Sequence, residues 1–406
     1  MNDRDVRRRE VRELVGLLMS ETGRATGGIH HTHRAISDRV FRGVGLFTRR
    51  STAPVKVMHD AITDGVYTAV RAGVDSAGVV GRNVADLPLK APVSRTVAGS
   101  AVIAAVNGLI GDELEGRRSP LTEEAVSVRV DGRPVDCTAS GLAAAFRETT
   151  GELVVFAHGL METEHAFRYG EGPHYEQVLA ERGFTAVHLR YNTGRRVSVN
   201  GRDIADELDA LVRNWPVPVE RIVLIGHSMG GLVLRSAAHQ ADLDGQEWVR
   251  DVTTTVSLGT PHLGAPLENL AHYASAGLSL FPETSAFGGL LRRRSVGIRD
   301  LRGGSLVDED WVGRDPDALG KAVAAEVPLL PQAKHYFVSA TVTRSPENPI
   351  GRVIGDGLVL SPSARGSHKA RRIGFDPENG LHLPGAHHFT LLGAPAVTEL
   401  LVEWVG

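Results

Sequence analysis

Cysteine is almost absent from this chain of 406 residues, because Cys137 is the only one. An internal disulfide is therefore excluded, and a single thiol fits a reducing compartment, so we expect a cytoplasmic protein. Cys137 follows a predicted hairpin and has no partner signature nearby, which favours an inert thiol over a catalytic one.

Lysine is also scarce, and most basic residues are arginines. Such a compositional bias makes a cluster of arginines weak evidence of function. The formal net charge is −3 at pH 7, which indicates neither a nucleic-acid partner nor an acidic tail. The lysines are Lys56, Lys90, Lys321, Lys334 and Lys369.

Long apolar runs are missing as well. Residues 1–24 carry charges throughout and lack the apolar core and cleavage site of a secretory signal. The longest uncharged run, residues 96–111, is shorter than a bilayer span and contains Ser100 and Asn107. It predicts a buried helix rather than a membrane-spanning one.

Residues 1–120 are expected to form a helical N-terminal region. Apolar residues recur at helical spacing over residues 11–18 and again over residues 58–74. These helices could pack on the rest of the chain, form an oligomer or contact a membrane surface. Their small-residue faces favour protein packing, and no basic amphipathic stripe supports membrane contact. A histidine cluster at His30, His31 and His33 lacks the further ligands of a zinc site, so no metal is expected.

The pattern changes near residue 120. Alternation over residues 126–130, then Asp131-Gly132, then residues 133–135 predicts a β-hairpin. Strands and helices alternate beyond it, which predicts a doubly wound, mostly parallel α/β sheet covered on both faces, in a domain of residues 121–406. The predicted strands are 153–157, 185–190, 221–226, 252–258, 334–341 and 371–375, and the predicted helices are 174–182, 201–213, 230–241 and 395–404.

Residues 265 to about 330 interrupt this alternation and hold no clean strand. A connection of this length inside a compact domain is usually functional or a small subdomain, so we expect a cap. Its leucines favour a hydrophobic or acyl substrate, although they could equally well pack the cap itself.

Ser228 lies in the segment Gly226-His227-Ser228-Met229-Gly230. This G-x-S-x-G pattern follows an apolar strand and precedes a helix, which is the setting of a nucleophile elbow. Glycines permit the tight turn, and the helix N-terminus stabilises negative charge beside the serine. We therefore expect Ser228 to be a nucleophile, against the alternative of a glycine-rich turn with an idle serine.

A serine hydroxyl needs a base, and behind such an elbow the acid and then the histidine follow in sequence. Asp356 lies in a glycine-flanked loop beyond a strand, where a carboxylate can orient an imidazole, although Asp-Gly is also a common turn. His387 and His388 both precede the last helix, where the base is expected, and their position alone leaves the choice between them open. His262 is a third candidate, but it comes before the acid in sequence.

An oxyanion hole requires two backbone N–H groups. Met229, directly after the nucleophile, should supply one of them. Leu160, in the loop Ala157-His158-Gly159-Leu160-Met161, should supply the other. His158 is expected to hold this loop rather than to act as a base.

The motifs together resemble those of bacterial lipases and esterases, a group that includes the lipase-like domain of the inositol deacylases that process glycosylphosphatidylinositol. The resemblance covers residues 120 to 406. It implies an eight-stranded α/β-hydrolase sheet and metal-independent ester hydrolysis, but it implies no particular substrate. It rests on His158-Gly159-Leu160, residues 226–231, Gly259-Thr260-Pro261-His262-Leu263-Gly264 and the segments around Asp356 and His388. The pattern His-Phe-x-Leu-Leu that begins at His388 resembles the family's C-terminal segment, so the resemblance favours His388 over His387 as the base.

We expect a serine hydrolase that cleaves carboxylic esters through Ser228, Asp356 and His388, with an acyl-enzyme and without a cofactor. Its partner would be a small-molecule ester or a lipid, and no nucleic acid. Two alternatives stay open. One is an acyltransferase of the same fold, in which an alcohol or thiol replaces water. The other is a non-enzymatic binding protein, which should have a damaged triad.

Overall fold

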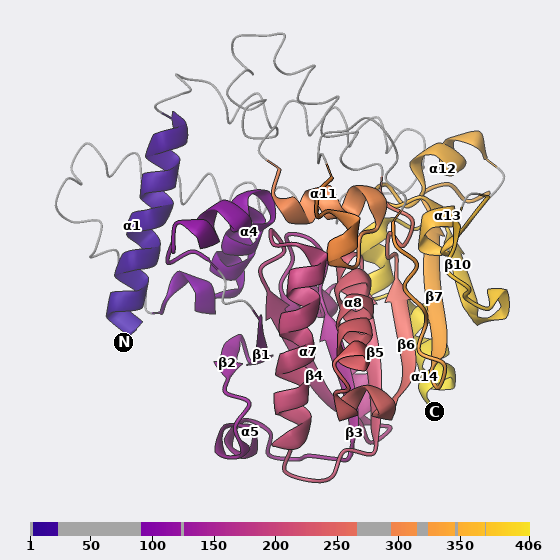
Figure 1. The fold of residues 1–406 in the computed structure, drawn as a ribbon, viewed down its shortest axis with the longest axis horizontal. Coiled ribbons are helices and arrows are strands. Elements are labelled where there is room, and N and C mark those ends of the chain that lie inside the picture. The colour runs from indigo at the N-terminus through magenta and orange to yellow at the C-terminus, as the bar shows by residue number, and fades with distance from the viewer. Residues whose placement is uncertain are drawn as a thin grey trace. The chain divides into compact units, whose positions relative to one another are not determined.

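The computed structural model describes residues 3–22, 91–122, 126–265, 294–314, 324–345, 348–369 and 371–406. The chain divides into two compact units. The first comprises Met1–Glu123 and Asn269–Ser295, and the second comprises Glu124–Glu268 and Val296–Gly406. Figure 1 shows the elements of both units.

The first unit is helical where it is described. Helices α1 (Asp3–Thr22) and α4 (Val97–Gly116) confirm two predicted helices, and η2 (Val93–Arg95) precedes α4. Glu10 of α1 accepts a hydrogen bond from the Val93 backbone N–H at 2.7 Å. Inside α4, the buried Asn107 side chain donates to the carbonyl oxygen of Leu121, which satisfies a polar group that would be costly to bury alone. The predicted helix at 58–74 and the histidines at 30, 31 and 33 lie outside the described residues.

The second unit is built on an eight-stranded sheet in the order β10-β7-β6-β5-β3-β4-β1-β2. All neighbours pair in parallel except β1, which is antiparallel to both β2 and β4. The predicted hairpin is confirmed as β1 and β2. The strands are β1 (Val126–Val130), β2 (Arg133–Val135), β3 (Glu152–Ala157), β4 (Thr185–Tyr191), β5 (Arg221–His227), β6 (Val252–Leu258), β7 (Lys334–Thr341) and β10 (Gly380–Pro384).

Helices cover both faces of this sheet. Side chains of α7 (Val197–Arg213) and α8 (Met229–Leu243) share one apolar core, and those of α6 (Tyr175–Ala180) and α14 (Pro395–Val405) share another. In Figure 1, α7 and α8 lie side by side across the sheet. Successive side chains of a strand point to opposite faces of the sheet, so the buried residues of β3 contribute to both cores. Val155, for example, packs in the first core and Phe156 in the second.

One predicted strand is wrong. Residues 371–375 do not enter the sheet, since only Arg371–Arg372 (β9) is extended and it pairs with Ser367–His368 (β8). Gly374 has a φ of 92°, which ends the extended run. The strand that borders β7 is instead β10, an edge strand that tolerates Pro384 at its end.

Shorter elements complete the second unit. Of the predicted cap, residues 294–314 and 324–330 are described and contain the helix α11 and the turn η5; the cap itself stays a prediction. Among the described helices, none is long and apolar enough to cross a membrane. The remaining elements are α5 (Ala139–Ala145), η3 (Glu164–Arg168), η4 (Glu247–Asp251), α11 (Val296–Gly303), η5 (Asp308–Asp310), α12 (Pro349–Ile354), α13 (Ser361–Ala364), η6 (Pro377–Asn379) and η7 (His388–Leu392).

Candidate active site

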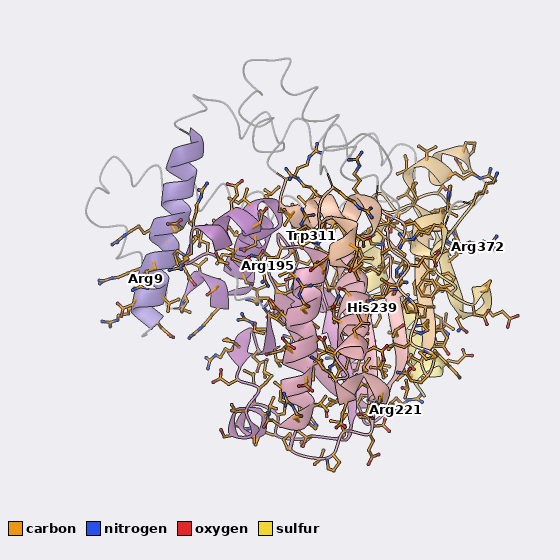
Figure 2. The ribbon with its side chains drawn as sticks, viewed as in Figure 1. Arg9, Arg195, Arg221, His239, Trp311 and Arg372 are labelled. Atoms are coloured by element: carbon orange, nitrogen blue, oxygen red, sulfur yellow. The ribbon has the colours of Figure 1, made fainter. Side chains whose placement is uncertain are left out.

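Ser228 occupies a sharp turn between β5 and α8. Its φ of 54° and ψ of −121° are rare for a residue with a side chain, and such strain concentrates at functional sites. The Ser228 backbone N–H donates to the Leu258 carbonyl oxygen of β6 at 2.8 Å, which fixes the turn against the sheet. In Figure 2, Arg221, which begins β5, lies away from Trp311, and Ser228 directly follows the other end of β5.

Glycines around Ser228 make the turn sterically feasible. A Cβ atom on Gly226 would overlap the backbone of Gly231, and one on Gly230 would overlap the Ala157 carbonyl oxygen. Backbone therefore approaches backbone here more closely than any side chain allows. The close contact with Ala157 joins the start of α8 to the end of β3.

Asp356 and His388 meet although 32 residues separate them. His388 Nδ1 lies 2.7 Å from Asp356 Oδ2, and the His388 backbone N–H donates to the Asp356 carbonyl oxygen at 3.0 Å. Asp356 Oδ1 accepts two more hydrogen bonds from the backbone N–H groups of Leu358 (2.9 Å) and Val359 (2.7 Å). Both side chains are almost fully buried, so the carboxylate has one orientation and holds the ring in one orientation.

This pairing changes the basicity of His388. Burial alone would lower the pKa of the imidazole, but the neighbouring Asp356 charge and its hydrogen bond outweigh burial, and Glu162 adds to them. The pKa of His388 is therefore raised above its ordinary value. Its Nε2 atom is buried and has no hydrogen-bond partner among the described residues, which leaves this nitrogen available to accept a proton.

The elements that carry Ser228 and His388 are in contact. The ring of His227, which directly precedes Ser228, has its centroid 4.7 Å from that of His388. A Cβ atom on Gly259, next to Leu258, would lie 3.1 Å from His388 Cε1. In the described part of the chain no hydrogen bond joins the Ser228 hydroxyl to His388 or His387. Bonds of this kind often tighten only when substrate is bound.

Among the described residues, the other candidate histidines form no hydrogen bond with the Asp356 carboxylate. Burial lowers the pKa of His387, and Asp356 forms its hydrogen bond with His388 instead. The His262 ring is buried, its two nitrogens have no hydrogen-bond partner in the described residues, and it packs edge-on against Phe375. His158 is buried and stacks on Tyr191, and burial lowers its pKa to about 4, so it is neutral at physiological pH.

The predicted oxyanion donors are the N–H groups of Leu160, in the loop after β3, and of Met229, at the start of α8. In the loop after β3, Gly159 N–H donates to Glu162, and Met161 N–H donates to the Thr193 hydroxyl. The N–H of Leu160, between them, donates to no group in the described residues, and the same holds for Met229 at the start of α8. Free N–H groups of this kind are what an oxyanion hole requires.

Glu162 was not anticipated from the sequence. Its Oε2 accepts from Gly159 N–H at 2.7 Å and lies 3.0 Å from His227 Nδ1. Its pKa is lowered because the attraction of His227 and the hydrogen bonds outweigh the burial of the carboxylate. The contact between Glu162 and His227 joins residues far apart in the chain and exists only in the folded protein. The sequence therefore contains no pattern that sets Glu162 apart from the neighbouring Glu164.

Metal-ligand clusters are a further question for any buried histidine-rich site. No three His, Cys, Asp or Glu side chains in the described ranges converge to hold a metal ion.

The order of the site along the sheet decides the fold. Ser228 follows β5, Asp356 follows β7 and α12, and His388 follows β10, all beyond the carboxyl ends of parallel strands of the sheet. The second unit has the α/β-hydrolase fold. The N-terminal helical unit is additional to it.

Comparison with known proteins agrees with this assignment. Residues 199–289 match the family model of the PGAP1-like alpha/beta domain. The match includes the elbow and the Gly259–Gly264 segment of the α/β-hydrolase domain, but it ends before Asp356 and His388. Comparison of the sequence with curated proteins finds no match.

Solved structures with similar folds include several lipases and esterases. A Bacillus licheniformis lipase in its mature form is 16% identical, with 62% of this chain and 91% of that chain covered and a TM-score of 0.39. An esterase of Pyrococcus furiosus is 17% identical, with coverages of 63% and 84% and a TM-score of 0.39. A lipase-esterase related protein of Clostridium acetobutylicum is 16% identical, with coverages of 63% and 95% and a TM-score of 0.34. These likenesses are remote, so the assignment depends on the strand order and the elbow.

Proposed function

We propose that the α/β-hydrolase domain is a serine hydrolase that cleaves carboxylic esters, with Ser228 as nucleophile, His388 as base and Asp356 as the group that orients the base. The observation that carries this proposal is the buried Asp356–His388 hydrogen bond beside a strained serine elbow. A buried carboxylate that holds one tautomer of a histidine is the arrangement that makes a serine hydroxyl reactive.

Acylation begins when Ser228 Oγ attacks the ester carbonyl carbon while His388 Nε2 takes the hydroxyl proton. The carbonyl oxygen becomes negatively charged and accepts hydrogen bonds from the N–H groups of Leu160 and Met229. Asp356 stabilises the charged imidazolium. The tetrahedral intermediate then collapses, the C–O bond to the alcohol breaks, and His388 returns the proton to the departing alcohol.

Deacylation repeats these steps with water. His388 removes a proton from a water molecule as its oxygen attacks the acyl-enzyme carbonyl. Collapse of the second intermediate releases the carboxylic acid and returns the proton to Ser228. An acceptor alcohol in place of water would give acyl transfer, so the products formed in the presence of added alcohol distinguish these two activities.

The substrate class is a further part of the proposal. Apolar residues in the predicted cap favour a hydrophobic or acyl ester. A cytoplasmic location stays a prediction of the sequence. Oligomerisation through the N-terminal helices and contact with a membrane surface stay open alternatives, and no sequence pattern supports the membrane contact.

Ser228→Ala tests the proposal. We expect the variant to lose about 10⁴-fold or more of the rate against p-nitrophenyl esters of graded chain length, because no other described group replaces the nucleophile. Its melting temperature should stay close to that of the original protein, because the Ser228 side chain makes no hydrogen bond in the described residues. Full esterase activity in Ser228→Ala would refute the proposed nucleophile.

A further inference from the structure

Glu162 is a largely buried acid beside the Ser228 turn, and it has no part in the chemistry above. The Glu162 side chain is only 12% exposed, and the His227 ring beside it is fully buried. The cost of burying a carboxylate must be offset by partners, so the identity of these partners is informative.

The partners of Glu162 belong to the machinery around Ser228. Its Oε2 accepts from Gly159 N–H at 2.7 Å, and its own N–H donates to the Gly159 carbonyl oxygen at 3.2 Å. These two bonds close a tight turn over residues 159–162. Met161 adopts a φ of 62° within the turn, a conformation that costs free energy for a residue with a side chain.

The same carboxylate oxygen reaches the elbow and, through it, the base. Glu162 Oε2 lies 3.0 Å from His227 Nδ1, and His227 Nε2 lies 3.4 Å from the His388 carbonyl oxygen. One chain of contacts therefore runs from the loop after β3, through the residue before Ser228, to the backbone of His388.

Glu162 also lies close to the nucleophile itself. A Cβ atom built on Gly159 would be 2.9 Å from Glu162 Oε2 and 3.0 Å from Ser228 Cβ. Glu162 and Ser228 thus lie on the same side of Gly159, and an ionised carboxylate acts most strongly on nearby groups that are shielded from water.

We infer that Glu162 is a positioning residue of the proposed ester hydrolysis: it holds the turn that presents the Leu160 N–H to the oxyanion, and its charge stabilises the protonated form of His388. The inference rests on the proposed function. By engaging Gly159 N–H, Glu162 also leaves Leu160 as the donor of this loop. The raised pKa of His388, to which Glu162 contributes together with Asp356, agrees with the second role.

Two variants separate these roles. Glu162→Gln keeps an oxygen that accepts the same two hydrogen bonds but removes the charge. We expect kcat at high pH to stay close to the original value, while the acid limb of the kcat/KM profile moves to lower pH, because His388 loses a stabilising charge. Glu162→Ala removes the hydrogen bonds as well, and we expect kcat to fall by about 10²-fold with little change in KM.

Glu176→Gln is the matched control. Glu176 Oε2 pairs with His188 Nε2 at 2.5 Å, so the variant alters the same kind of carboxylate–imidazole contact away from Ser228. We expect neither its pH profile nor its kcat to change.

An unshifted acid limb in Glu162→Gln would overturn the electrostatic role, even if Glu162→Ala failed to fold. A folded Glu162→Ala with unchanged kcat would overturn the positioning role. Either result in an original protein that hydrolyses esters through Ser228 leaves the proposed function standing. If the original protein does not react at Ser228, the proposed function itself is contradicted, and the inference about Glu162 falls with it.

Discussion

At the scale of single residues, the carboxylate of Asp356 accepts hydrogen bonds from three groups, the His388 ring and the N–H groups of Leu358 and Val359. The two backbone donors belong to the turn that follows Asp356. The acid is thus oriented by its own loop before it contacts the histidine. In the proposed mechanism, such preorganisation lets Asp356 stabilise the imidazolium without moving during the reaction.

Asp356→Asn should therefore be deleterious without unfolding the domain. We expect kcat to fall by about 10⁴-fold, as for a triad whose histidine is held in the wrong tautomer. Asp356 raises the pKa of His388, so the proposed base loses its proton at a higher pH than an ordinary histidine does. Loss of the carboxylate charge should move the acid limb of the fluorophosphonate labelling rate to lower pH.

Asp244→Asn is the control for this prediction, because Asp244 is an exposed residue at the end of α8. It should label at the original rate with an unchanged pH profile. Labelling of Asp356→Asn with the original rate and pH dependence would mean that Asp356 does not act on the base.

At the scale of elements, the turn from β5 into α8 depends on small residues. Gly230→Ala should lower the free energy of unfolding by about 3 kcal/mol, because its methyl group would overlap the Ala157 carbonyl oxygen and neither backbone segment can yield easily. Chemical denaturation followed by circular dichroism measures this change.

Gly303→Ala provides the comparison for Gly230→Ala. A Cβ atom on Gly303, at the end of α11, would meet nothing closer than the Ser305 hydroxyl at 3.6 Å. The variant should change the free energy of unfolding by at most about 1 kcal/mol, in the stabilising direction. Equal effects of the two substitutions would mean that the elbow is not close-packed.

The strands and the elbow were predictable because their signals are local. Continuous apolar runs mark β3 and β5, and the glycines around Ser228 mark the turn, since both features are determined by neighbouring residues. The order of serine, acid and histidine then followed from the order of the strands. Asp356 could be named for this reason from the sequence, whereas the order alone left both His387 and His388 as candidates for the base.

The prediction failed where a strand depends on its neighbour. Residues 371–375 are predicted as a strand, but Arg371 donates to the carbonyl oxygen of Ala325 and Gly374 bends the chain. The true edge strand, β10, begins with a glycine and ends with a proline, so it lacks a strand signal of its own. Its pairing with β7 comes from tertiary contacts, such as the Phe337 ring that occupies the space beside Gly380. Glu162 was missed because its contact with His227 is also tertiary and leaves no local pattern in the sequence.

At the scale of the whole molecule, everything proposed for catalysis lies in the second unit. All eight strands of the large sheet and both of its apolar cores belong to that unit. We therefore expect a chain from which residues 1–123 are removed to fold and to label at Ser228 at a rate close to that of the full chain. A soluble, folded deletion variant that no longer labels would mean that the N-terminal helices contribute to the site.

The central claim is that Ser228 is the reactive nucleophile of the molecule. Its most direct test is peptide mapping by mass spectrometry after treatment of the full chain with a fluorophosphonate. We predict a single adduct on Ser228 in the tryptic peptide that ends at Arg235, with none in Ser228→Ala. An adduct on another serine, or no adduct in the folded protein, would contradict the account.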